Sequence, residues 1–401
     1  LKASRRTCPS ARARARAPMA LRGEAGWDAA MAQEFGADRW AALRPVLQRD
    51  VEHVCFVNQF LAPDAVEALE ATYALQPTHI PGAFSFDVPQ DSGCRYRVVE
   101  HEEDGVLFVE AGSQEDACAV AQRAASAQAP LLTQPSLPPF LFLEGSAVVA
   151  ALALQASEGE TVLDACAAPG GKALVLASTM FGASAAACRE PHGLLVCNEA
   201  SKARAARMQR SVRAFLPPAL CDGRPPHGPF VAFTAADMGT AVNSMEKYAP
   251  YDKILVDAPC NVDRDLLRGR DEKMARWSVG TVKVSAERQL KLLRNALWLL
   301  KEGGVLLFCN RALAGGECDE VVEQLLVQER DRFELRVLPV EEEICRMVPN
   351  YGGESTGHGM RILPDVGFFG PIYISRIQLV QRRHPDISHI PDVRRLPLRA
   401  P

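Results

Sequence analysis

The spacing of hydrophobic positions switches repeatedly between strand-like and helix-like patterns from Glu144 onward. Short apolar runs predict strands at 161–165, 194–199, 230–235, 253–257, 304–309, 333–339 and 371–379. Apolar positions with helical spacing predict helices at 172–181, 202–215, 285–300 and 317–329. This alternation is typical of an α/β fold in which a largely parallel sheet has helices on both faces. No strong helix separates the last two strands, so we expect them to pair antiparallel.

The N-terminal part has a weaker pattern. It predicts helices at 29–35, 40–54, 65–75 and 115–127, and short strands at 96–99 and 106–109 that flank a turn. These elements indicate a small α+β module over residues 23–130. Four prolines from Pro130 to Pro139 mark the join to a larger unit over residues 140–381.

Composition adds few constraints. With 401 residues, 48% of them hydrophobic, the chain is long enough to bury a full core. No apolar run reaches the length that a bilayer requires. The 12 cysteines are scattered without a Cys-x-x-Cys pair, which argues against a zinc ribbon and a disulfide scaffold and fits a reducing compartment. The histidines are isolated as well, so no metal site is predicted.

The first 22 residues have a composition of their own. They carry seven Lys and Arg residues and no acid, and Ala, Ser and Arg dominate up to Met19. Such a segment is typical of an organelle transit peptide, with a mitochondrion as the first expectation and a plastid equally compatible. The other interpretation is a translated upstream segment with Met19 as the true start, which leaves a cytoplasmic location open.

The most informative stretch is Asp164–Lys172, which connects a buried strand to a helix. Gly170 and Gly171 let the backbone turn sharply and approach a ligand without side-chain hindrance. The free N–H groups at the start of the following helix then face an anionic or polar ligand. A second turn, Asp257–Cys260, follows the strand 253–257. Two such turns predict a ligand site at the carboxyl ends of the strands.

Two more acids close strands at the same edge of the predicted sheet. Glu199 ends the second strand, where a carboxylate can accept hydrogen bonds from both ribose hydroxyls of a nucleoside. Asp237 follows the third strand. Each is also compatible with an ordinary solvated acid at a strand end, so the residues alone leave both interpretations open.

Together these stretches resemble the Sun-domain (Nop/Sun, RsmB-like) family of S-adenosylmethionine-dependent RNA cytosine-5 methyltransferases, over roughly residues 143–380. Phe369–Tyr373 is similar to the Phe-Gly-Pro-Met-Tyr of the mitochondrial ribosomal-RNA branch, and Pro259–Arg264 to its Pro-Cys-x-x-Asp-Arg. The resemblance implies a Rossmann-like, seven-stranded methyltransferase domain over residues 140–381. It also implies S-adenosyl-L-methionine as the cofactor and RNA, in the first place organellar ribosomal RNA, as the substrate.

The same resemblance implies which residues bind the cofactor. Asn198–Arg204 is similar to the family's Asn-Asp-x-Ser-x-x-Arg, with Glu199 in the place of the ribose-binding aspartate. By family analogy Asp237 would accept the adenine amino group, and Asp257 would lie between the methionine end of the cofactor and the target base. The expected cofactor-binding residues are Cys166, Ala167, Ala168, Pro169, Gly170, Gly171, Lys172, Glu199, Arg204, Asp237 and Asp257.

The resemblance fails at one residue that matters for chemistry. Sun-family enzymes use a nucleophilic cysteine in a Thr-Cys after the fifth strand and the cysteine of Pro-Cys to resolve the adduct. Cys260 fills the Pro-Cys place, and Cys260 and Asp257 are the expected catalytic residues. In the fifth-strand run Gly303–Leu313, matching from either end puts Arg311 where the nucleophilic thiol belongs. Cys309, two residues earlier, is expected to be a buried core thiol.

Three hypotheses follow from this replacement. In the first, the protein methylates RNA with Cys260 as the nucleophile, and the charge of Arg311 lowers the pKa of that thiol. In the second, it has kept cofactor and RNA binding but lost turnover, and acts as an assembly factor. In the third, it methylates a nitrogen or a protein side chain, which needs no nucleophilic cysteine.

Charge bears on how RNA would be bound. Without residues 1–22 the chain holds 38 basic and 49 acidic side chains, a net charge of −11. An acidic body is a poor RNA binder unless a local basic strip or a basic partner supplies the contacts. The mitochondrial branch acts with a helical-repeat partner of the transcription-termination-factor type, so the resemblance favours a partner. The basic, proline-rich tail 382–401 is expected to be disordered, with a role as an RNA-contacting extension as the alternative.

Overall fold

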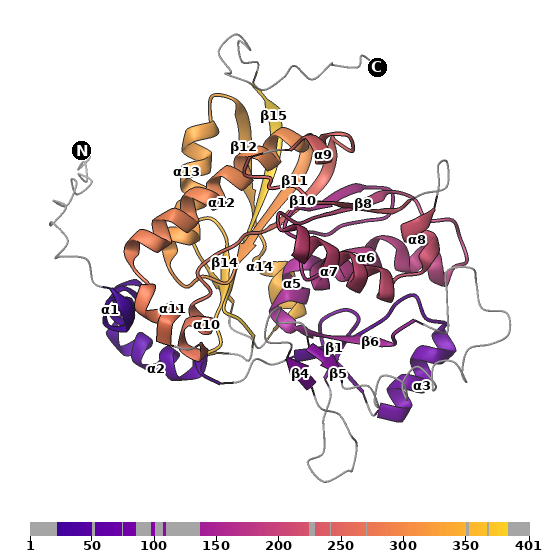
Figure 1. The fold of residues 1–401 in the computed structure, drawn as a ribbon, viewed down its shortest axis with the longest axis horizontal. Coiled ribbons are helices and arrows are strands. Elements are labelled where there is room, and N and C mark those ends of the chain that lie inside the picture. The colour runs from indigo at the N-terminus through magenta and orange to yellow at the C-terminus, as the bar shows by residue number, and fades with distance from the viewer. Residues whose placement is uncertain are drawn as a thin grey trace, which may run out of the picture.

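The structure, a computed structural model, contains a large sheet in the upper part of Figure 1 and a smaller one below it. It describes residues 22–49, 53–73, 75–85, 98–100, 107–109, 137–223, 229–240, 242–269, 271–349, 353–366 and 369–383. Within these ranges, no helix is long and apolar enough to cross a bilayer.

The large sheet has the predicted architecture. Its main strands are β7 (Thr161–Asp164), β8 (Leu194–Asn198), β9 (Val231–Thr234), β10 (Tyr251–Asp257), β11 (Leu300–Asn310), β12 (Phe333–Leu338) and β15 (Ile372–Arg382). They run in the order β9-β8-β7-β10-β11-β15, and β12 pairs with β15. The first five are parallel, whereas β15 is antiparallel to both β11 and β12, which confirms the pairing expected for the last two strands. The seven-stranded, Rossmann-like fold is therefore confirmed.

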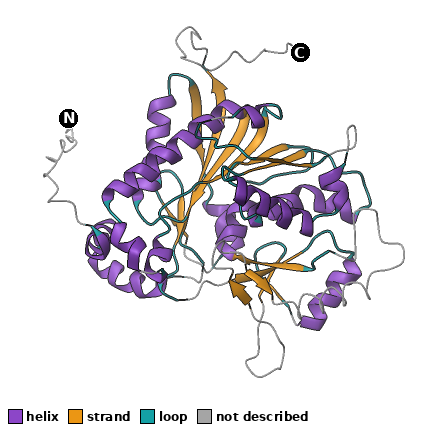
Figure 2. Cartoon of the chain, in the orientation of Figure 1, coloured by secondary structure: helices purple, strands orange, loops and turns teal. Residues whose placement is uncertain are grey.

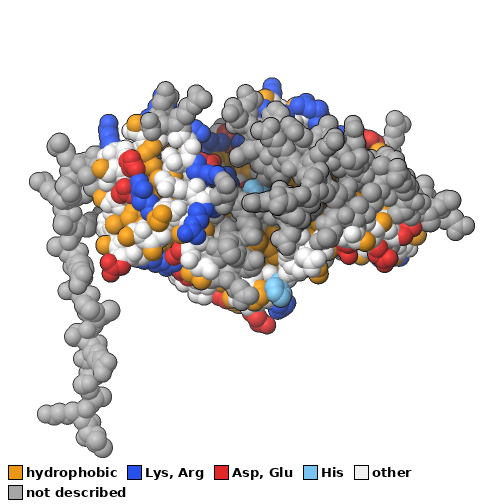
Figure 3. All heavy atoms as spheres, turned by 90° about the horizontal axis from the view of Figure 1, so that it is seen from below, with side chains coloured by type: hydrophobic (Ala, Val, Ile, Leu, Met, Phe, Trp, Pro, Cys, Tyr) orange, Lys and Arg blue, Asp and Glu red, His pale blue; other side chains and the backbone are white. Residues whose placement is uncertain are grey.

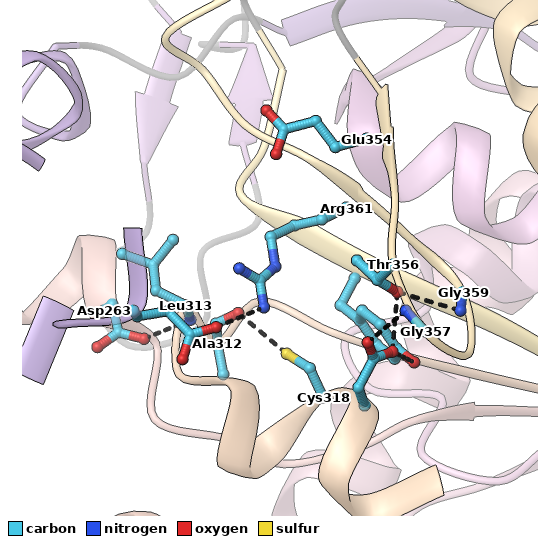
Figure 4. A network of polar contacts seen from close by, with 12 residues as sticks. Asp263, Ala312, Leu313, Cys318, Glu354, Thr356, Gly357, Gly359 and Arg361 are labelled. Atoms are coloured by element: carbon cyan, nitrogen blue, oxygen red, sulfur yellow. Dashed lines mark hydrogen bonds and ion pairs between the residues drawn. The ribbon is translucent and has the colours of Figure 1, made fainter. Parts of the chain in front are cut away.

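A hairpin of β13 (Gly353–Ser355) and β14 (Met360–Ile362) extends this sheet to nine strands by pairing with β15. The sequence did not predict the hairpin or the helix α14 (Glu341–Met347) before it, because elements this short show no clear period. Figure 4 shows the loop of the hairpin, where Asp319 accepts hydrogen bonds from the Thr356 hydroxyl at 2.8 Å and the Gly357 N–H at 2.7 Å.

Helices cover both faces of the large sheet (Figure 2). The longest are α6 (Gly171–Ala186), α7 (Lys202–Phe215), α12 (Val279–Leu299) and α13 (Asp319–Glu329). Alternate residues of β10 enter two different cores, Leu255 on the α6 face and Ile254 on the α12 face, as parallel strands buried on both sides require. The helix predicted at 285–300 begins earlier, because Ser278 and Thr281 form a capping box ahead of the apolar stripe.

The remaining helices are short and lie mostly in connections. They are α5 (Gly145–Ala153), α8 (Pro218–Asp222), α9 (Asn243–Glu246), α10 (Asp263–Arg268), α11 (Asp271–Arg276) and the 3-10 helix Gly315–Glu317. Of these, α10 and α11 follow the Asp257–Cys260 turn and lead into α12.

The smaller sheet has six strands in the order β2-β3-β1-β6-β5-β4. Their bounds are β1 (His53–Val57), β2 (Gln76–Pro77), β3 (Ala83–Ser85), β4 (Val98–Glu100), β5 (Leu107–Val109) and β6 (Phe140–Glu144). The central pair is β1 and β6, so β6, at the start of the unit expected over 140–381, completes the N-terminal sheet. The helix predicted at 40–54 is wrong at its end, because the run Val-Cys-Phe-Val forms β1. The predicted helix 115–127 lies outside the described residues, and the helix predicted at 65–75 is α3 (Pro63–Tyr73).

The first two helices pack away from the small sheet. Figure 1 shows α1 (Gly23–Phe35) and α2 (Ala37–Leu47) beside α10 and α11, and their buried side chains share a core with Met274 and Trp277. Trp27 Nε1 donates a buried hydrogen bond to Asp263 Oδ1 at 2.7 Å. The other oxygen of Asp263 accepts from the Leu313 N–H at 2.7 Å, a contact that Figure 4 shows. Helix α1 is thereby tied to the loops that follow β10 and β11.

This tie predicts unequal losses of stability for two tryptophan variants. Trp27→Phe keeps a ring but removes a donor from a buried carboxylate, so we expect the free energy of unfolding to fall by about 2–3 kcal/mol. Trp40→Phe is the matched control, because Trp40 Nε1 donates to Asp28, which Arg44 also holds at 2.8 Å. Its expected cost is about 1 kcal/mol. Urea unfolding measures both, and equal losses would contradict the tie.

Candidate active site

One large cavity, about 1060 Å³, opens at the carboxyl ends of the parallel strands. Every residue expected to bind the cofactor or to act in catalysis lines it, together with Glu144 of β6 and Arg311. Those expected residues are Cys166, Ala167, Ala168, Pro169, Gly170, Gly171, Lys172, Glu199, Arg204, Asp237, Asp257 and Cys260. The structure therefore brings them together, and their roles remain predictions.

The glycine turn brings the start of α6 against its neighbours. Gly170 has a φ of +119°, and a Cβ there would lie 3.0 Å from Cγ2 of Val212 on α7. A Cβ on Gly171 would lie 2.6 Å from Cδ2 of Leu143 on β6. The positive φ favours glycine at position 170, and a side chain at position 171 would displace that of Leu143. Both glycines line the cavity.

Glu199 is held in place at the tip of β8. It is 5% exposed, and its Oε1 accepts a hydrogen bond from the Ser201 N–H at 2.9 Å. Arg204 lies 3.6 Å from Oε2 and also donates to the carbonyl of Ala168 at 3.2 Å, which joins α7 to the glycine turn. These contacts fix the direction of the carboxylate and leave it at the cavity wall.

Asn198 is a bracing residue that the sequence interpretation did not single out. Its Nδ2 donates to the carbonyls of Ala165 at 3.0 Å and Ala236 at 2.9 Å. Its Oδ1 accepts from Thr234 Oγ1 at 2.8 Å. The tips of β7, β8 and β9 are thus held together by one buried amide. Asp237 follows β9, where its Oδ1 accepts from the Gly239 N–H at 2.9 Å.

An ion pair lies at the centre of the cavity wall. Lys172 Nζ is 2.7 Å from Asp257 Oδ2, which connects α6 to the tip of β10. Burial acts to lower the pKa of Lys172, but the Asp257 carboxylate outweighs it and the net pKa is raised. Cys309 Sγ donates to the other oxygen, Oδ1, at 3.6 Å. Cys309 is fully buried, as predicted for a core thiol.

A further acid lies beneath this pair. Asp164 ends β7 and is fully buried, and in the described part of the chain no side chain donates a hydrogen bond to its carboxyl group, which has only the Cys166 N–H nearby. Burial and the negative charge of Asp257 raise the pKa of Asp164 to about 7, against the attraction of Lys172. No role was predicted for Asp164 from the sequence, although its position at the end of a strand is a signal for a residue near the site.

Cys260 is half-buried and lines the cavity. Its Sγ accepts a hydrogen bond from the backbone N–H of Arg311 at 3.4 Å. Burial, with the charge of Glu317, raises the pKa of the thiol well above its ordinary value. The N–H and the charge of Arg311 both act to lower this pKa, as the hypothesis expects, but burial outweighs them.

The guanidinium of Arg311 reaches across the cavity instead. It lies 3.0 Å from Glu144 Oε2, on β6, and 3.9 Å from Asp265 Oδ2, on α10. Arg311 thus links the small sheet to the loop after β10, at the place where the family pattern has its nucleophile.

Buried polar contacts hold the Cys260 loop. Glu317 is fully buried and accepts hydrogen bonds from the backbone N–H and side chain of Asn261 and from Gln289. Burial raises the pKa of Glu317 to about 7. Arg264, in the same loop, donates to the carbonyl of Gly370 at 2.6 Å, so the two segments that resemble the mitochondrial branch contact each other. No pattern in the sequence identified Glu317.

The fold and the position of the site define a Rossmann-like methyltransferase class. The chain is similar in structure to a methyltransferase homolog protein from Pyrococcus horikoshii, with a TM-score of 0.56 and 19% identity over 89% of this chain and 94% of that one. A model of the 16S rRNA methyltransferase RsmB/F family matches residues 151–378. The chain belongs to this family.

Two relatives illustrate the range of similar enzymes. A mitochondrial tRNA (cytosine(34)-C(5))-methyltransferase of Mus musculus is 28% identical over 256 residues, which are 61% of this chain and 64% of the relative. The 5-cytosine rRNA methyltransferase nsun-4 of Caenorhabditis elegans is 27% identical over 263 residues, 63% of this chain and 52% of the relative. The matched segments thus span about half to two thirds of these relatives.

Because the pKa of Asp164 is raised, replacing this side chain with a neutral one should stabilise the fold by an amount that depends on pH. The folded state keeps the proton up to about pH 7, whereas the unfolded chain releases it near pH 4, so stability is lost as pH rises between these values. Asp164→Asn should therefore raise the free energy of unfolding by about 2–4 kcal/mol at pH 8 and by less at pH 5.

Denaturant unfolding at the two pH values measures this gain. Asp252→Asn is the control of opposite sign, because Asp252 accepts from Lys301 at 2.8 Å and the Thr161 N–H at 2.9 Å, and its pKa is lowered. That variant should lose stability at pH 8. A gain for Asp164→Asn that does not change with pH would contradict the assignment.

Proposed function

We propose that this chain is an S-adenosylmethionine-dependent RNA cytosine-5 methyltransferase that acts on ribosomal RNA in the mitochondrion. The observation that carries the proposal is that Cys260, Asp257 and the strand-tip acid Glu199 line one cavity. The family and the relatives support the reaction, and the rRNA and mitochondrial relatives support the substrate and the location.

The residues of the cavity fit adenosylmethionine. Glu199 would bind the ribose hydroxyls, Asp237 the adenine amino group, and the N–H groups at Gly170 and Gly171 the carboxylate of the methionine end. The carboxylate of Asp257 lines the cavity and favours a cation, and adenosylmethionine carries one on its sulfur. When bound, this cofactor supplies the methyl group.

Cys260 would supply the nucleophile. Carbon 5 of cytosine is not nucleophilic in the resting ring, so a thiolate must first add at carbon 6. Cys260 is half-buried in the cavity wall and three residues after Asp257, which supports a role for this thiol beside the expected methyl donor. After carbon 5 is methylated, loss of its proton and of the thiolate restores the ring. Because the resting thiol has a raised pKa, substrate binding or alkaline pH must supply the thiolate.

A second candidate function is favoured by the same contacts. The raised pKa of Cys260 and the bridge from Arg311 to Glu144 also fit a chain that binds cofactor and RNA without turnover. Such a protein would act as an assembly factor. The two functions differ in whether the thiol bonds to the base.

The proposal includes partners. RNA is the substrate class of the relatives, and the net charge of −11 for residues 23–401 supports a basic helical-repeat protein of the mitochondrial termination-factor type as a further partner. Among the coloured side chains on the face shown in Figure 3, both blue basic and red acidic groups occur.

Covalent trapping separates the two candidate functions. The substrate is a small-subunit ribosomal RNA transcript that contains 5-fluorocytidine. Its fluorine replaces the hydrogen that carbon 5 must lose, so the thiol adduct persists after methyl transfer. With adenosylmethionine present we expect a denaturation-stable adduct that Cys260→Ser abolishes and Cys345→Ser, an exposed thiol on α14, leaves intact. Because the Cys260 pKa is raised, the trapping rate should rise about tenfold per pH unit from pH 7 to 9.

Arg311→Cys provides the converse test. If wild type gives no adduct with this RNA while Arg311→Cys does, the protein is the silent factor and lacks only its thiol. An adduct in wild type that survives Cys260→Ser would contradict the assignment of the nucleophile.

A further inference from the structure

The outer face of α7 is unusually basic. This helix, Lys202–Phe215, carries five Lys and Arg residues and no acid. Ala205, Met208 and Val212 form its buried face, so the basic side chains project from the opposite side. Four of them, Arg204, Arg207, Arg210 and Arg213, recur every three residues.

This spacing makes a ridge of like charges. Residues three apart are neighbours on a helix surface, and such rows run at about 45° to the helix axis. From Arg204 to Arg213 the row rises about 14 Å along the axis. Neighbouring cations repel one another, so the row destabilises the helix unless anions lie against it.

Among the described residues, two acids pair with members of this row, and Arg207 has a contact of its own within the chain. Glu199 pairs with Arg204 at one end of the ridge, and Asp222 with Arg213 at the other. Lys202 and Arg210 are exposed, and no acid of the described residues pairs with either. Two exposed positions between the cations, Ala203 and Ala206, hold small side chains rather than the glutamates that a solvated helix commonly carries.

The ridge begins at the rim of the active-site cavity. Arg204 lines the cavity, and so do Ser211 and Ala214, which lie about two and three turns further along the same helix. Arg268 and Arg288 line it from other elements. A polyanion lying on α7 would therefore lead directly into the cavity.

We infer that the outer face of α7 is the docking surface for the phosphate backbone of the RNA strand next to the target base. The inference rests on the proposed function and gives the RNA a specific path. Arginine suits this contact, because its guanidinium donates two parallel hydrogen bonds to a phosphate. A chain with a net negative charge needs a local basic surface to bind RNA, and the outer face of α7 provides one beside the site.

Neutralising the ridge tests the inference. In Lys202→Gln/Arg207→Gln/Arg210→Gln, the full chain should bind a labelled ribosomal RNA fragment at least tenfold more weakly at low salt. The slope of log affinity against log salt should fall by about two to three, one for each lost phosphate contact. Fluorescence anisotropy at several salt concentrations measures both, and the affinity for adenosylmethionine should stay within about twofold.

A matched variant removes the same charge elsewhere. The control variant is Arg330→Gln/Arg336→Gln/Arg346→Gln. Its residues lie at the end of α13, in β12 and on α14, toward the opposite edge of the sheet from α7. This variant should leave the salt slope unchanged. Equal losses of RNA affinity in the two triple variants, or an unchanged salt slope in the α7 variant, would contradict RNA docking on α7 and leave the proposed function intact. A wild-type chain that binds adenosylmethionine but no RNA would overturn both.

Discussion

Five parallel strands end at one edge of the sheet, and this edge forces several carboxylates into a single cavity. Glu199 and Asp257 line the cavity at the ends of β8 and β10, and Asp164 is buried at the end of β7 between them, so the three carboxyl groups cannot be separated without breaking the sheet. Lys172 offsets part of this repulsion through its 2.7 Å pair with Asp257. Asp164 is fully buried, where desolvation and the charge of Asp257 raise its pKa to about 7. Destabilised acids of this kind are typical of binding sites.

The second constraint is the position of Cys260. Its loop is fixed by Glu317 beneath it and tied to α1 through Asp263, so the thiol has little freedom to move. The Arg311 backbone touches the sulfur, whereas the Arg311 side chain turns away to Glu144. Arg311, which by the family resemblance stands where a thiol is expected, bridges the end of β11 to β6 of the small sheet. With arginine at position 311, Cys260 is the cysteine of the cavity wall that we expect to act as the nucleophile, and the second candidate function assigns it no chemical role.

Much of this arrangement was predictable from the sequence. The buried strands and amphipathic helices of the larger unit have strong periods, and helix 202–215 was predicted to the residue. The strand-tip acids were predictable because parallel topology brings strand ends together. The expectations that the structure did not meet failed for physical reasons. Val54 was placed in a helix, although its β-branched and aromatic neighbours pair with β6. The direction of the Cys260 pKa depends on burial and on Glu317, and neither can be read from spacing.

Cofactor binding at the strand tips is measured most directly by titration calorimetry of the full chain. We expect saturable heat with one site for adenosylmethionine and for its demethylated product, and at least a tenfold weaker affinity in Glu199→Ala. A folded wild-type chain that shows no heat with either compound, or a Glu199→Ala variant that binds as tightly as wild type, would contradict this expectation.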